Sequence, residues 1–201
     1  MSTAHPVDVD TDGAAGNARL TSATGLVLLV ALFLEGLTLL EVRQLITPHI
    51  FIGLLLIPPV AVKLGSTGYR FFRYYAGSRD YRLKGPPPLP IRILLAPLVL
   101  LATALLFASG IALVALGPQG GIVLGLHKAS FVVWFGAMSL HVLAHFVRIP
   151  GLVRPDVRGG EGVGGSRVRL ATVAGAVAAG AIAAVATVPL ITPWTHWIGG
   201  H

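Results

Sequence analysis

The sequence contains no cysteine and few charged residues. Of its 201 residues, 11% are charged and 54% are hydrophobic. Without cysteine there can be no disulfide, no thiolate-bound iron–sulfur cluster and no cysteine zinc site, so histidine and carboxylate side chains are the remaining metal ligands. With so few charged residues, a water-soluble domain could not cover its apolar core. The sequence therefore predicts an integral membrane protein.

Long apolar runs predict five membrane-spanning helices in an all-α bundle. Each run has roughly the 17 to 25 residues that a bilayer crossing needs. We expect the spans at residues 21–42, 49–65, 91–116, 122–147 and 168–190. Residues 21–148 would form a four-helix membrane core, joined by a Gly/Arg-rich cytoplasmic linker (149–167) to the fifth helix (168–190). We expect a disordered polar tail at 1–20 and an outer tail at 191–201.

Basic residues collect in two of the loops between these spans. The net charge of +7 comes mainly from arginines between the second and third spans and between the fourth and fifth. Such loops face the cytoplasm by the positive-inside rule. This places the N-terminus in the cytoplasm and the C-terminus outside the cell membrane. The arginines are topology signals, so we expect the bilayer and not nucleic acid as the partner.

Histidines stand out because they are costly inside a membrane. The fourth span contains His127, His141 and His145, and at about 100° per residue all three project from one face of a helix. His49 opens the second span. By the predicted topology His49 and His127 lie at similar depth near the outer side. Two imidazoles facing each other across a helix bundle are the arrangement for axial ligation of a haem iron.

Several residues near this pair are candidates for supporting contacts. Gly53 lies one turn after His49, where a missing side chain would let a macrocycle approach the backbone. Arg43 and Lys128, at the same outer end, are candidates to pair with haem propionates. Glu35, past the middle of the first span, has three interpretations: a hydrogen bond to a ligand histidine, a proton carrier, or a protonated packing residue.

These residues carry a family resemblance. The His127-x13-His141 spacing, the adjacent His145 and the second helix opening with His49 resemble the membrane di-haem cytochromes b. That group includes the cytochrome b561-like and ferric-reductase-like bundles and the membrane subunits of formate dehydrogenases, hydrogenases and molybdenum oxidoreductases. The resemblance covers residues 21–148. It implies haem b, stacked as two haems in such families, and an electron-transfer subunit rather than a stand-alone enzyme, working between the quinone pool and a redox partner such as a molybdenum oxidoreductase.

The inner half of the bundle departs from that pattern. Lys63 stands at the fourteenth position after His49, where the family has a second histidine. One interpretation keeps an inner haem, with His141 or His145 as one ligand and Lys63 as a neutral amine opposite. In the others the inner haem is lost, and the two histidines bind a quinone headgroup, relay protons or hydrogen-bond to backbone. We expect one haem, with two as the alternative.

Two non-redox interpretations stand beside the cytochrome. In the first, a small proton or metal-ion transporter or an assembly scaffold, the histidines of the fourth span, Lys63 and Glu35 line a polar path. In the second, a structural anchor without cofactor, the histidine periodicity has no explanation.

The fifth span is rich in small residues. Its four-residue steps run through Ala171, Gly175, Ala179 and Ala183. Such stripes permit close helix approach, so we expect this helix to pack on the bundle or on another subunit in a homo- or hetero-oligomer.

Overall fold

Long helices make up most of the structure, a computed structural model that describes residues 9–83, 85, 89, 91–119, 121–145 and 164–199. Five helical segments in these ranges are long and apolar enough to cross a membrane, and the described residues contain no strand. Their helices are α1 (Val9–Thr38), α2 (Ile46–Tyr75), α4 (Ala96–Leu116), α5 (Gly121–His145) and α7 (Ser166–Ala186). The prediction of an all-α, multi-pass membrane bundle is thereby confirmed.

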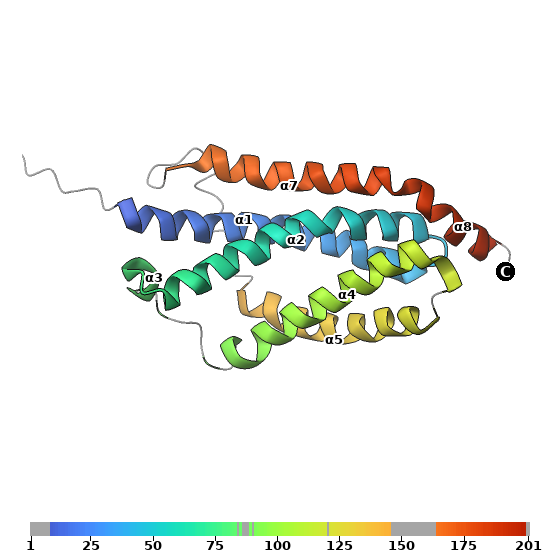
Figure 1. The fold of residues 1–201 in the computed structure, drawn as a ribbon, viewed down its shortest axis with the longest axis horizontal. Helices are drawn as coiled ribbons and strands as arrows, with labels where there is room; N and C mark the ends of the chain where they lie inside the picture. The colour runs from blue at the N-terminus through green and yellow to red at the C-terminus, as the bar shows by residue number, and fades with distance from the viewer. Residues whose placement is uncertain are drawn as a thin grey trace, which may run out of the picture.

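Short elements lie at the two ends of the bundle. They are η1 (Leu39–Glu41), α3 (Arg79–Leu83), η2 (Ile91–Leu95), η3 (Gly117–Gln119), η5 (Val188–Ile191) and α8 (Thr192–Gly199). The long helices run side by side, and α1 begins at the opposite end of the bundle from α8 (Figure 1). An odd number of crossings requires this arrangement.

The helices pack in two groups. One group contains α1, α2 and α7, and the other is the hairpin of α4 and α5 (Figure 1). Between the groups, α2 approaches α4, so α2 has neighbours from both. The bend of α2 part-way along its length follows from Pro58 and Pro59, which remove two backbone donors inside the helix.

The face of α7 that packs on the bundle differs from the predicted stripe. The buried residues are Arg169, Val173, Ala176, Gly180 and Ala184. The predicted stripe, represented by Gly175, is exposed. Gly180 lies directly against the backbone of Leu55 in α2. Alanine and glycine occur all around this helix, so the position of α2 decides which small residues become buried.

Several predicted boundaries are corrected by the structure. Residues 9–20, expected in a disordered tail, belong to α1, because polar side chains beyond the apolar run find partners on α2: Asn17 Nδ2 donates to the Ser66 carbonyl at 2.9 Å. Helix α2 begins at Ile46 rather than at residue 49, and α7 covers Ser166–Ala186 rather than 168–190. The end of the predicted fourth span and most of the predicted linker, together residues 146–163, lie outside the described residues.

The expected outer tail is also structured. Residues Thr192–Gly199 form α8, and the indole of Trp194 is buried. Trp194 Nε1 donates a hydrogen bond of 3.2 Å to the carbonyl of Leu113, near the end of α4. This contact holds α8 against the α4–α5 hairpin.

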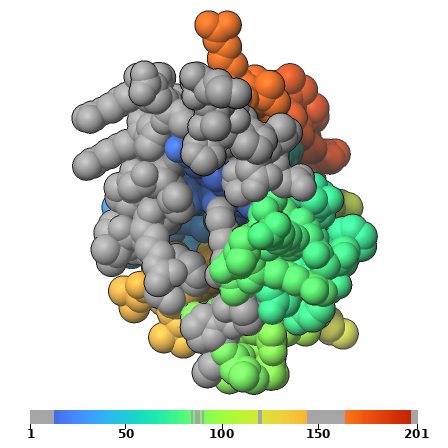
Figure 2. Space-filling model, turned by 90° about the vertical axis from the view of Figure 1, so that its left-hand side faces the viewer, coloured from blue at the N-terminus to red at the C-terminus, as the bar shows by residue number. Residues whose placement is uncertain are grey.

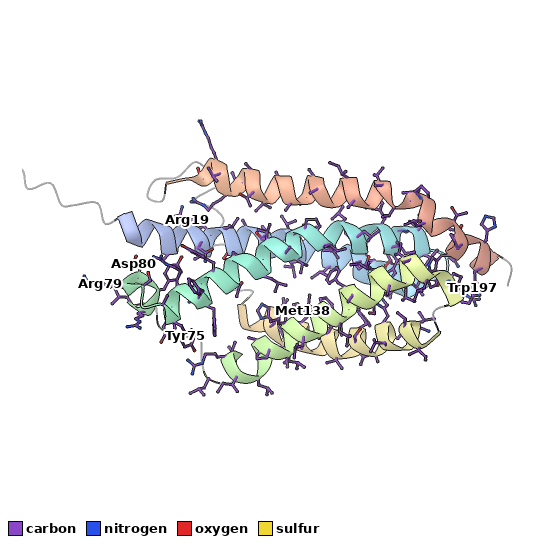
Figure 3. All side chains as sticks on the ribbon, viewed as in Figure 1. Arg19, Tyr75, Arg79, Asp80, Met138 and Trp197 are labelled. Atoms are coloured by element: carbon purple, nitrogen blue, oxygen red, sulfur yellow. The ribbon has the colours of Figure 1, made fainter. Side chains whose placement is uncertain are left out.

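The end of the bundle where α1 begins carries most of the described basic residues. We call it the basic end, and its members are Arg19, Arg70, Arg73, Arg79, Arg82, Arg92, Arg167 and Arg169. Figure 2 views this end, where the end of α2 with α3, and the start of α7, flank the start of α1. Arg19 and Arg79 mark it in Figure 3, and Trp197 marks the opposite end.

A cation–aromatic cluster fixes α3 at the basic end. The guanidinium of Arg73 lies 6.0 Å from the ring centre of Tyr69 and 5.9 Å from that of Tyr81. The Tyr81 hydroxyl is buried without a hydrogen-bond partner in the described part of the chain. Burial is the main cause that raises the pKa of Tyr81, and the neighbouring Tyr69 is the second.

Candidate functional site

The structure brings His49 and His127 together. His49 lies in the first turn of α2, and His127 lies in the second turn of α5, which starts from the same end of the bundle. Their ring centres are 6.4 Å apart, and the ring planes make an angle of 77°. The two histidines expected to meet therefore lie close together at one end of the bundle.

Helix α1 holds His49 through one ring nitrogen. His49 Nδ1 is 2.8 Å from Glu35 Oε1 and 3.1 Å from Thr38 Oγ1. The Thr38 hydroxyl donates its own hydrogen to the Glu35 carbonyl at 2.6 Å, so the Thr38 oxygen accepts at His49. Nδ1 is therefore the donor, and the lone pair lies on Nε2.

Helix α4 holds His127 in the same way. His127 Nδ1 lies 3.0 Å from Ser109 Oγ and 3.2 Å from the Leu106 carbonyl. A carbonyl can only accept, and the Ser109 hydroxyl donates to the Leu105 carbonyl at 2.7 Å. His127 is therefore also protonated on Nδ1 with a lone pair on Nε2.

Gly110 on α4 leaves room for the His127 ring. A Cβ built at Gly110 would lie 3.3 Å from Cε1 of His127, which is closer than most Cβ contacts, and at an ordinary 3.7 Å from Nδ1. The missing side chain lets the imidazole lie against the backbone of α4.

The pair offers two nitrogen ligands, and the described part of the chain adds no third ligand. Neither Nε2 has a hydrogen-bond partner in the described part of the chain. No group of three or more His, Cys, Asp or Glu side chains in the described ranges is placed to hold a metal ion. A metal bound here would need its other ligands from outside the described residues.

Glu35 is the acidic member of the site. Its side chain is 15% exposed and that of His49 is 20% exposed. Oε2 of Glu35 is buried and has no hydrogen-bond partner among the described residues. Of the interpretations left open by the sequence, the structure supports a hydrogen bond in which Glu35 accepts from a histidine, His49.

The other predicted contacts are distributed around this end. A Cβ at Gly53 would lie 3.8 Å from Glu35 Oε1, so Gly53 faces the carboxyl group on α1. Arg43 and Lys128 are exposed, Arg43 beyond the end of η1 and Lys128 next to His127.

Lys63 is directed at α1. Its Nζ donates a hydrogen bond of 2.7 Å to the Thr21 carbonyl, in the space left by Gly25. Asn17 and Ser66 continue this polar cluster, because Ser66 Oγ accepts from Thr21 at 2.8 Å and the Ser66 carbonyl accepts from Asn17. Sequence reasoning identified Lys63 and missed this cluster.

The inner histidines are separate from the pair. His141 is half-buried and lies fourteen residues after His127 on α5. His145 is the last residue of α5, and its side chain lies outside the described part. Within the described ranges, no histidine lies in the inner half of α1, α2, α4 or α7.

Sequence reasoning also missed the groups that orient the two rings. Thr38, Ser109 and the Leu106 carbonyl had no distinguishing pattern, because hydroxyl residues are common in membrane helices and a carbonyl has no sequence signature. The one available signal was the Ser109–Gly110 pair, a small polar step inside an otherwise apolar helix.

Comparison with known proteins gives no family for this chain. No family model, no curated protein and no solved structure matches it. The resemblance to membrane cytochromes b stays a prediction, and function has to be argued from the site.

Proposed function

We propose that this chain is a membrane-embedded b-type cytochrome that binds haem between His49 and His127 and transfers single electrons. The observation that carries the proposal is the matched state of the two imidazoles. Each is held through Nδ1 by a neighbouring helix, and each leaves Nε2 without a partner in the described residues. Metal-ligating histidines characteristically use one nitrogen for the metal and the other for an orienting hydrogen bond.

The distance between the rings supports the same proposal. A metal ion bound to imidazole by a bond of about 2.0 Å lies about 3.1 Å from the ring centre, because a five-membered ring with bonds of about 1.33 Å has a radius of about 1.1 Å. Two imidazoles on opposite sides of one ion therefore have ring centres about 6.2 Å apart. The observed separation is 6.4 Å.

The number of ligands favours haem over a protein-bound metal ion. Zinc and non-haem iron sites take three or more ligands from side chains, and the described residues offer no such group here. A porphyrin supplies four nitrogens itself and needs two axial ligands. His49 and His127, whose ring centres lie 6.4 Å apart, would supply those two ligands.

The chain's own residues would each have a defined task. His49 and His127 hold the iron, while Glu35 and Ser109 fix the orientation of the two rings. Arg43 and Lys128 are exposed at the same end, where they are available to carboxylate groups such as propionates. When bound, haem supplies reversible one-electron chemistry, and the apolar helices around it keep water away.

Lys63 supports one haem rather than two. A second haem would need a ligand opposite His141 or His145, and Lys63 is the residue at the corresponding position of α2. Its amine is engaged with the Thr21 carbonyl on α1. We therefore assign one haem. His141 and His145 would then serve a purpose other than haem ligation: binding a quinone headgroup, transferring protons or hydrogen-bonding to neighbouring backbone.

The distribution of charge supports an orientation and a class of partner. With the basic end in the cytoplasm, the N-terminus is inside and the histidine pair lies near the outer face. The chain would then act as an electron-transfer subunit between membrane quinone and an outer oxidoreductase, of which a molybdenum enzyme is one candidate by family resemblance alone.

Absorption spectroscopy of the purified protein tests the proposal. We expect a Soret band that shifts on dithionite reduction, with sharp α and β bands, and a pyridine haemochrome ratio of one haem per chain. His49→Ala and His127→Ala should each abolish the spectrum, whereas the matched variant His141→Ala should keep it. A folded protein purified without colour after haem-supplemented expression would refute the proposal and favour a proton or metal-ion path. Bleaching by His141→Ala alone would show that the ligands are misassigned.

A further inference from the structure

The two histidines of the pair are held by chemically different groups. His127 is held by a hydroxyl and a carbonyl, which are neutral. His49 is held by the carboxyl group of Glu35 and the hydroxyl of Thr38. The Nδ1–Oε1 distance of 2.8 Å is the shortest of these contacts, in keeping with a charge-assisted hydrogen bond.

This difference has an electronic consequence for any metal bound at Nε2. A carboxyl group that accepts the Nδ1 hydrogen leaves the imidazole ring richer in electrons, so Nε2 becomes a stronger donor. A stronger donor stabilises the oxidised form of the iron and lowers its reduction potential. A carbonyl or hydroxyl acceptor has the same effect to a smaller degree.

We infer that Glu35, on a helix that supplies no haem ligand, is a positioning residue that makes His49 the stronger of the two axial donors and lowers the reduction potential of the site. The inference rests on the proposed function. The reduction potential would then depend on Glu35 as well as on the identity of the two histidine ligands.

The surroundings of Glu35 support a dedicated role. A carboxyl group inside a membrane helix is costly, and Glu35 has no basic side chain as a partner among the described residues. Its contact through Oε1 is with His49, while Oε2 is buried without a hydrogen-bond partner in the part of the chain that the structure describes. Gly53 leaves the carboxyl group room, since a Cβ there would lie 3.8 Å from Oε1. Glu35 is therefore placed to act on His49. It forms no ion pair with a lysine or arginine in this part of the chain.

Redox titration of the full-length, haem-loaded protein tests the inference. Glu35→Gln keeps the shape of the side chain and an oxygen acceptor but removes the carboxyl group. We expect it to retain the haem spectrum and to raise the midpoint potential. Glu41→Gln is the matched control, because it makes the same change at an exposed residue of η1. Ser109→Ala, which leaves the Leu106 carbonyl at His127 Nδ1, should shift the potential less than Glu35→Gln.

The outcomes separate this inference from the proposed function. A wild-type protein that binds no haem overturns the proposed function and this inference with it. Haem in every variant, with equal potentials in wild type and Glu35→Gln, overturns the inference alone. Equal rises of the midpoint potential in Glu35→Gln and Glu41→Gln would also overturn the inference, because they would indicate a general effect of charge. If Glu35→Gln loses haem, retention in Glu41→Gln and Ser109→Ala supports positioning by Glu35, and loss in all three refutes it.

Discussion

Gly180→Ala, which adds one methyl group, tests the contact between Gly180 and α2. A Cβ at Gly180 would overlap the carbonyl oxygen of Leu55 and would lie 2.9 Å from its carbonyl carbon and 3.1 Å from its Cα. These atoms belong to the backbone of α2 and cannot rotate away. Gly180→Ala therefore has to push α7 outward, and the close packing that stabilises membrane helix pairs is lost along that face.

The expected magnitude follows from two opposing terms. Overpacking a well-fitted contact costs about 1–3 kcal/mol. Alanine in a helix is favoured over glycine by up to about 1 kcal/mol. Gly175→Ala provides the matched control, because Gly175 lies on the exposed face of α7 with nothing within 4 Å of its added Cβ. Both variants gain the same helix propensity from replacing glycine by alanine. The difference between their unfolding free energies therefore isolates the effect of packing and should be about 1–3 kcal/mol.

Reversible unfolding in mixed detergent micelles can measure this difference. Tryptophan fluorescence is a suitable signal because Trp194 lies on α8, which follows α7 and packs against α4. We expect Gly180→Ala to unfold at lower denaturant than wild type, and Gly175→Ala to unfold at the same or higher denaturant. Equal free energies for the two variants would show that α7 does not dock on α2 through Gly180.

Three further substitutions test the site and the two ends of the bundle. Gly110→Ala places a Cβ 3.3 Å from His127 Cε1 and should lower the haem-to-protein ratio under the proposed function; an unchanged ratio would show that the ring has free space. Trp194→Phe removes the hydrogen bond to the Leu113 carbonyl and part of a buried side chain, so unfolding free energy should fall by about 1–3 kcal/mol, and no loss would mean that α8 is not docked. Tyr81→Phe removes a buried hydroxyl that lacks a partner among the described residues, so stability at neutral pH should stay within about 1 kcal/mol or rise. Because the pKa of Tyr81 is raised, wild-type stability should decline as pH increases above about 10, and thermal melts against pH should show this decline weakened in Tyr81→Phe.

The spans could be predicted from sequence because lipid imposes length and apolarity on each of them. Their ends could not, because they depend on partners elsewhere in the chain. Helix α1 starts before the apolar run because Asn17 bonds to Ser66, and α8 forms where Trp194 bonds to α4. Packing of α7 on the bundle was among the alternatives predicted, but which face it buries could not be predicted, since small residues on every side leave no periodic signal.

The meeting of His49 and His127 could be predicted because charge and helix counting place both at one depth. Glu35 was a candidate partner because acidic residues are rare in membrane helices. Which nitrogen each ring offers could not be predicted. It depends on Thr38 and on the Leu106 carbonyl, which are selected by helix rotation and not by residue type.

The grouping of the helices has a consequence for the order of biosynthesis. The chain passes from α1 and α2 to the α4–α5 hairpin and then returns to α2 with α7. Both histidines therefore precede α7 in the chain, so the helices that carry them can enter the membrane before α7 has been made. Helix α7 then packs on α2 just beyond His49, through Gly180 at Leu55. A ribosome-bound chain that ends before α7 would already hold both histidines, while the helix that carries His49 would still lack its final neighbour.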